Sequence, residues 1–175
     1  MIVVGVLTPH ADAAVGAVAR RAASGGGARV EIVGVAPAGV DGDRVLGAFA
    51  AAGVGHATVT RSGAPMIEPA DLELALRYLP DVRVIVLGAP DPGLLGVAAD
   101  GSSWSGAALI VLGPLGAEAV AIADAAGAIV LEPPSSDPDE AFAGLVAAFA
   151  LRLDAGEGAA SAWRSTLASL AVDPA

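Results

Sequence analysis

The run Val82-Arg83-Val84-Ile85-Val86-Leu87 is the clearest fold signal in this chain. Apart from Arg83 it is continuously apolar and rich in β-branched residues. A strand that helices cover on both faces has this composition, whereas a strand with one face in water alternates apolar and polar residues. Similar apolar runs occupy residues 2–7, 30–35 and 107–112. These runs predict buried parallel strands in one sheet.

Segments with helical spacing alternate with these strands. We expect helices at residues 11–23, 43–52 and 70–79, a weak strand at 57–60 and a short helix at 92–99. This βα alternation predicts an α/β fold with three layers, in which a doubly wound, mostly parallel sheet has right-handed crossovers. The 175 residues suit a single domain over residues 1–175.

The last third of the chain changes character. Short apolar runs on either side of Gly127 predict strands at 119–122 and 128–131, and helices are expected at 140–153 and 159–170. Trp104 lies in a stretch rich in glycine and serine that resembles a loop. It is expected either to anchor a contact or to pack over the sheet edge, whereas Trp163 is expected in the core.

Composition excludes several classes of function. The chain has no cysteine, so disulfides and thiolate metal sites are excluded, and its two histidines are too few for a histidine-rich metal site. It has no lysine, so it contains no P-loop. A net charge of -10 argues against nucleic-acid binding, which needs clustered cations.

Hydropathy is high but is not concentrated in one span. Hydrophobic residues make up 55% of the chain, and the longest apolar region, residues 107–131, is interrupted by Pro114, Glu118 and Asp124. The N-terminus lacks the basic flank of a signal peptide. We therefore expect no membrane association and a cytoplasmic location.

The segment Pro134-Ser135-Ser136-Asp137-Pro138-Asp139-Glu140-Ala141-Phe142-Ala143-Gly144 carries the strongest functional signal. It resembles the D-T-T-G-A-G-D-A-F-x-G helix start of the ribokinase-like (PfkB-type) sugar and nucleoside kinases. In that family the turn leaves backbone N–H groups free to stabilise a transferring phosphoryl group, and the second Asp is the general base. Ala141, Phe142 and Gly144 match the family letters.

Four residues of this segment depart from the family. Asp137, Pro138, Asp139 and Glu140 stand where Gly, Ala, Gly and Asp would stand, so the anion site gains negative charge and loses a donor. One interpretation is a capping box, with Asp137 as N-cap, Pro138 at the first helical position and Glu140 at the third. The other keeps Glu140 as a catalytic general base with a longer side chain.

Further segments carry the resemblance in the same order along the chain. They are residues 41–46, similar to a D-G-x-x-L helix; residues 69–72 and 81–87, similar to the next helix and strand; and residues 111–117. The last of these is similar to a V-T-L-G-x-x-G-A turn that lies beside the nucleotide in the family. The resemblance therefore implies that Gly113 and Gly116 are cofactor-binding residues.

Substrate-binding candidates follow the first strand. His10 and Asp12 would lie at the carboxyl ends of the strands, where open α/β sheets bind ligands. The family's substrate-binding Asp follows a G-x-x-x-x-D spacing, and that position counted from Gly5 is His10. Alternatively, Thr8 and Pro9 begin a helix and His10 is a surface residue of its first turn.

Some features of the kinase family are missing from this chain, and their absence bears on three hypotheses about its function. Its N-x-x-E motif and its substrate asparagine are absent because the chain has no asparagine, and no lid hairpin fits after the first strand. The first hypothesis is a degenerate ribokinase-like domain, a pseudokinase that binds a small-molecule or nucleotide ligand or acts in assembly, as a homodimer. The second is an ATP-dependent carbohydrate or nucleoside kinase that uses Mg2+, and the third is a structural partner subunit without a small-molecule site.

Overall fold

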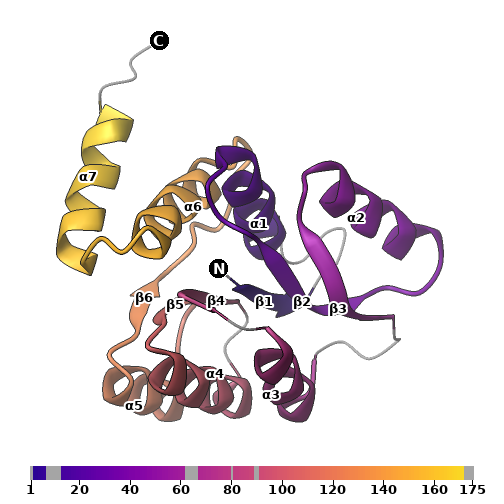
Figure 1. Cartoon of the computed structure of the whole chain (residues 1–175), viewed down its shortest axis with the longest axis horizontal. Helices are drawn as coiled ribbons and strands as arrows, with labels where there is room; N and C mark the ends of the chain where they lie inside the picture. The colour runs from indigo at the N-terminus through magenta and orange to yellow at the C-terminus, as the bar shows by residue number, and fades with distance from the viewer. Residues whose placement is uncertain (1, 7–12, 62–66, 80, 89–90, 172–175) are drawn as a thin grey trace.

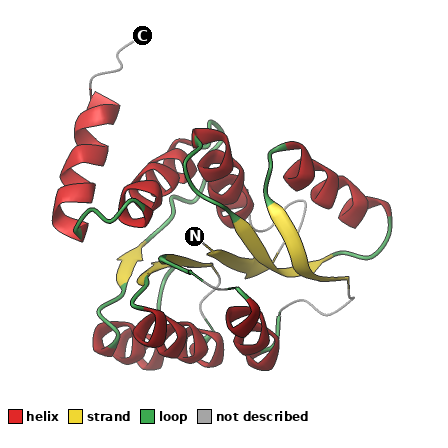
Figure 2. Cartoon of the chain, in the orientation of Figure 1, coloured by secondary structure: helices red, strands yellow, loops and turns green. Residues whose placement is uncertain are grey.

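A six-stranded, wholly parallel sheet lies between two layers of helices in the computed structural model, which describes residues 2–6, 13–61, 67–79, 81–88 and 91–171 (Figures 1 and 2). The strands are β1 (Ile2–Val6), β2 (Glu31–Ala36), β3 (Gly55–Arg61), β4 (Val84–Gly88), β5 (Ala108–Leu112) and β6 (Ile129–Leu131). The helices are α1 (Ala13–Gly25), α2 (Val40–Ala51), α3 (Pro69–Tyr78), α4 (Pro92–Ser105), α5 (Ala117–Ala125), α6 (Ala141–Asp154) and α7 (Ala159–Ala171). The predicted α/β class and doubly wound sheet are confirmed.

The strand order is β3-β2-β1-β4-β5-β6. The first three strands therefore extend the sheet in one direction from β1, and β4 then pairs with the other side of β1. In this pair, Ile2 of β1 lies opposite Ile85 of β4. Open α/β sheets bind ligands outside the carboxyl ends of the strands at such a reversal. The connections that follow β5 and β6 begin at these carboxyl ends.

The core consists of two apolar layers, one on each face of the sheet. Successive side chains of a strand point to opposite faces, so Val84 and Val86 join one cluster while Ile85 and Leu87 join the other. All five residues of β4 are buried. This two-sided burial explains why the strands are continuous apolar runs in the sequence.

Helices α1, α2 and α6 cover one face of the sheet, and α3, α4 and α5 cover the other (Figure 1). Helix α7 lies outside α6 at one end of the molecule. The rings of Phe149 and Trp163 join these two helices in an edge-to-face contact, with centroids 5.2 Å apart and planes at 84°. The expectation that Trp163 packs against the core is confirmed.

The expected strand at residues 119–122 is wrong, because this segment lies within helix α5. Ala119 and Ala123 are the buried residues of α5, four positions apart on one helical face. Alanine has the highest helix propensity. In addition, the parallel strands β5 and β6 need a crossover between them, which α5 supplies.

Helix α4 is longer than expected and contains Trp104, so the interpretation of that stretch as a loop is wrong. The Asp91 carboxylate caps the start of α4 by accepting from the N–H groups of Gly93 and Leu94, and Gly106 ends it with a left-handed backbone. Trp104 in the last turn is 86% exposed, so it does not pack over the sheet edge.

Two properties of the described residues bear on function. No helix among them is long and apolar enough to cross a bilayer. Within the same ranges, no three His, Cys, Asp or Glu side chains gather in an arrangement that would hold a metal ion.

Candidate functional site

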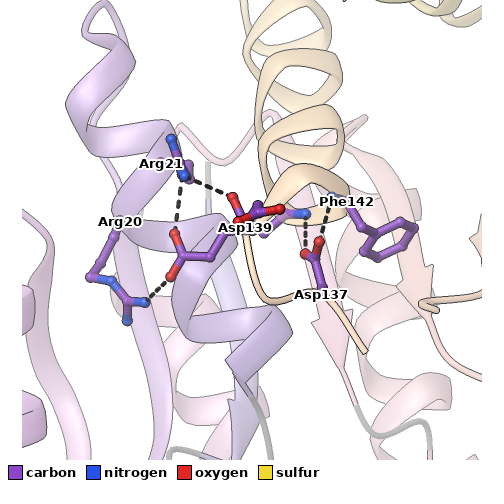
Figure 3. Close-up of polar contacts among 7 residues, drawn as sticks. Arg20, Arg21, Asp137, Asp139 and Phe142 are labelled. Atoms are coloured by element: carbon purple, nitrogen blue, oxygen red, sulfur yellow. Dashed lines mark hydrogen bonds and ion pairs between the residues drawn. The ribbon is translucent and has the colours of Figure 1, made fainter. Parts of the chain in front are cut away.

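The candidate site is the turn that leads from β6 into α6, at the carboxyl edge of the sheet (Figure 3). The Asp137 carboxylate points at the N-terminus of α6. Its Oδ1 accepts from the N–H of Phe142 and its Oδ2 from the N–H of Ala143, both at 3.1 Å. These are two of the backbone donors that a helix start leaves without an intrahelical partner. The chain therefore places its own anion at the amino end of this helix.

The capping-box interpretation is wrong about all three positions, because the N-cap residue is Glu140, although the Asp137 side chain does cap the helix. Helix α6 begins at Ala141, and Glu140 precedes it with a left-handed backbone at a φ of 52°. Pro138 consequently lies in the turn before the helix, and Glu140 is not its third residue. Asp137 reaches the helix from further away than an N-cap residue because the intervening turn folds back, with the Glu140 N–H donating to the Asp137 carbonyl at 3.1 Å.

The Glu140 side chain is held by two arginines of α1 (Figure 3). Arg20 Nη2 donates to Glu140 Oε1 at 2.9 Å, and Arg21 Nε donates to Glu140 Oε2 at 3.1 Å. Arg21 Nη2 also donates to the backbone carbonyl of Asp139 at 3.3 Å. The turn is thus fastened to a helix about 120 residues earlier in the chain.

This arrangement bears on the interpretation of Glu140 as a general base. A general base must lie within about 2.6–3.2 Å of the proton that it removes, with an oxygen available to accept it. Both carboxylate oxygens of Glu140 already accept a hydrogen bond from a guanidinium group. The geometry is that of an ion-paired link between α1 and the start of α6.

The two glycines expected at the nucleotide lie in the connection between the neighbouring strand β5 and helix α5. Gly113 follows β5, and its N–H donates to the carbonyl of Leu131 at the end of β6, at 3.1 Å. Gly116 is the N-cap residue of α5. The structure therefore places Gly113 next to the strand from which the α6 turn begins. His10 and Asp12 lie outside the described residues.

A cavity of about 540 Å³ lies beside the turn. Residues of the turn and of α6 line it, together with Arg21 of α1 and Leu170 of α7. Gly144 of the family-like segment is also part of its lining, and a side chain at this glycine would meet no neighbouring atom within 4 Å. Arg21 and Glu140, which form an ion pair, both line this space.

Arg20 and Arg21 were not singled out from the sequence. They are the one pair of adjacent arginines in the chain, and residues 137–140 hold three carboxylates in four positions. Nearby cations offset the charge of a compact acidic turn, so the two adjacent arginines were the one feature of the sequence from which this pairing could have been predicted. Nothing local relates the two segments, because only the packing of α6 against α1 brings them together.

The fold is similar to solved structures of sugar kinases. The chain resembles a fructokinase with bound ATP from Xylella fastidiosa at 13% identity and a TM-score of 0.61, covering 99% of this chain and 86% of that one. It resembles a PfkB protein from Polaromonas sp. JS666 at 16% identity and a TM-score of 0.64, covering 95% and 90%. A carbohydrate kinase from Agrobacterium tumefaciens gives 12% identity and a TM-score of 0.63, covering 98% and 85%.

These likenesses confirm the ribokinase-like resemblance at the level of the fold. No protein-family model matches the chain. A search of curated proteins likewise gave no match.

Proposed function

We propose that this chain is a ribokinase-like domain that does not transfer phosphate and that acts in ligand binding or assembly. One observation carries the proposal: the Asp137 carboxylate already accepts the helix N–H groups of Phe142 and Ala143. In the kinases that the turn resembles, such groups stabilise the transferring phosphoryl group. Here the carboxylate of Asp137 occupies the position at these N–H groups that a phosphoryl group would take.

Electrostatics favours this conclusion. A helix N-terminus stabilises an anion by about 0.3–2 kcal/mol. Two like charges 4 Å apart near a protein surface repel by about 4 kcal/mol at an effective dielectric constant of about 20. A phosphate approaching the amides beside Asp137 would therefore meet repulsion larger than the attraction of the helix. The carboxylate of Asp139 in the same turn adds to it, whereas the charges of Arg20 and Arg21 are shared with the carboxylate of Glu140.

The proposal is tested by following phosphate transfer from radiolabelled ATP, with Mg2+, to a panel of sugars and nucleosides. We expect no transfer above that of a protein-free reaction. The alternative, an ATP-dependent carbohydrate kinase, is supported by fold neighbours that include the fructokinase with bound ATP. Transfer that Glu140→Gln abolishes and the matched surface change Glu118→Gln leaves intact would establish the kinase and overturn the proposal.

Assembly as a homodimer is the second part of the proposal. It is supported by Leu167 and Leu170 near the end of α7, which are 44% and 50% exposed. They lie three residues apart on a helix and so share one face. We expect light scattering to give twice the monomer mass of 16.9 kDa. Replacing both leucines by serine should then give the monomer, whereas a monomeric parent chain would contradict this part.

A further inference from the structure

A groove of about 760 Å³ lies between α3 and α4, at the opposite edge of the sheet from the α6 turn. Its position follows from its lining, which includes residues just before β4 and residues at the end of α4, just before β5. It therefore lies near the amino ends of the central strands. Neither the family-like turn nor the glycines after β5 contribute to its lining.

The floor of the groove is apolar. It is formed by the side chains of Leu76, Leu79, Val82 and Val97. Gly101 of α4 completes the floor, because a Cβ atom there would lie 2.7 Å from Leu76 Cδ1. The missing side chain at residue 101 lets Leu76 lie directly against α4. A volume of this size is in the range of small-molecule sites, which are typically about 300–1,000 Å³.

Trp104 borders the groove from the last turn of α4. With 86% of its surface exposed, it is the most exposed of the large apolar side chains among the described residues. An indole face next to a cavity offers both apolar contact area and the electron-rich surface that attracts cations. Trp104 is not among the residues that form the apolar core of this layer or pack against it.

The charged residues that line the groove carry a net negative charge. Its lining contains Glu73, Arg77, Asp81 and Asp100. Arg77 pairs with Glu73 one helical turn earlier, so the positive charge is already compensated. In the described part of the chain, neither Asp81 nor Asp100 makes an ion pair. The two carboxylates leave the groove with a net negative charge.

We propose that this groove binds an organic cation with an apolar body, such as an arylalkyl ammonium. Its hydrocarbon part would lie on the leucine and valine floor and against Trp104. Its ammonium group would pair with Asp81 and Asp100, neither of which forms an ion pair with a described residue. This site is independent of the phosphate chemistry discussed above, since it lies at the other edge of the sheet.

The test uses Trp104 as its own reporter. The chain has two tryptophans, so Trp163→Phe leaves Trp104 as the single source of indole fluorescence. The probes are 4-phenylbutylamine, 4-phenylbutanol and 4-phenylbutyrate, which share a body and differ in charge. We expect a saturable change in emission with the amine, about tenfold weaker binding of the alcohol, and no saturation with the carboxylate.

Charge-neutralising variants locate the cation. The double variant Asp81→Asn and Asp100→Asn should weaken amine binding about tenfold and leave alcohol binding unchanged. A matched control, Glu118→Gln with Asp124→Asn on α5, alters the net charge equally and should bind the amine like the parent. Equal loss in both double variants would mean that only the overall charge matters, which would overturn the site.

Calorimetry of the unaltered chain with the same three probes makes the test independent of the Trp163 change. Saturable heat for the amine, with weaker heat for the alcohol, supports the proposal. Equal affinity for amine and alcohol overturns the cation requirement. No saturable heat with any probe overturns the site altogether.

Discussion

At the scale of single residues, Asp137 caps the start of α6 with its side chain. It satisfies two backbone N–H groups that a phosphate would otherwise find free. Asp137→Ala should lower the free energy of unfolding by about 1 kcal/mol, as the loss of a helix cap does. Asp137→Ser, which keeps an acceptor, should recover part of that loss. Urea unfolding of the three proteins checks the order, and equal midpoints would contradict the capping role.

Glu140 gives a second prediction at this scale. Its ion pair with Arg20 is partly exposed, with 35% of each side chain accessible, so we expect a coupling energy of only about 0.2–1 kcal/mol. A double-mutant cycle with Glu140→Gln and Arg20→Met measures it. The coupling should shrink in high salt because exposed charges are screened. A coupling that is zero in low salt as well would show that the contact does not fasten the turn.

At the scale of elements, α2 contains a glycine whose role the structure explains. A Cβ atom at Gly42, in the first turn of α2, would lie 1.8 Å from the carbonyl oxygen of Pro37. Backbone must therefore move to admit any side chain, and Gly42→Ala should destabilise the protein by about 1–3 kcal/mol. Gly47→Ala in the same helix meets no atom within 4 Å and should stabilise it by about 0.4–1 kcal/mol.

Thermal unfolding of these two variants is a matched comparison, since each adds one methyl group to the same helix. Opposite shifts in melting temperature are expected. If Gly42→Ala were as well tolerated as Gly47→Ala, the close approach between α2 and the end of β2 would be contradicted.

Elements also show where reading the sequence succeeds. The central strands were predictable because burial on both faces leaves a continuous apolar run such as residues 84–88. The same reasoning misassigned residues 119–122, since a short alanine-rich apolar run fits a strand and a helix equally well. The predicted length of helix α4 was too short, because the glycine and serine residues near Trp104 suggest a loop. The caps at Asp91 and Gly106 instead enclose one continuous helix.

At the scale of the whole molecule, the layers were predictable and the candidate site was only partly so. Alternating strands and helices imply a doubly wound sheet whatever the side chains do in detail. That Asp137 caps a helix was predictable from the sequence, but its partners five and six residues away were not, because the helix was expected to begin at Pro138. The pairing of Glu140 with the arginines of α1 was not predictable from the sequence, because it depends on how two distant helices pack. The groove beside Trp104 was missed for the same reason, since its walls come from α3 and α4.

We propose that this ribokinase-like fold has lost its phosphate site to an internal carboxylate. Calorimetric titration with ATP and with ADP, each with Mg2+, from micromolar to millimolar concentrations tests it most directly. We predict no saturable heat with either nucleotide for the parent chain. Saturable heat with a defined stoichiometry would show that the chain binds nucleotide and would contradict the proposal.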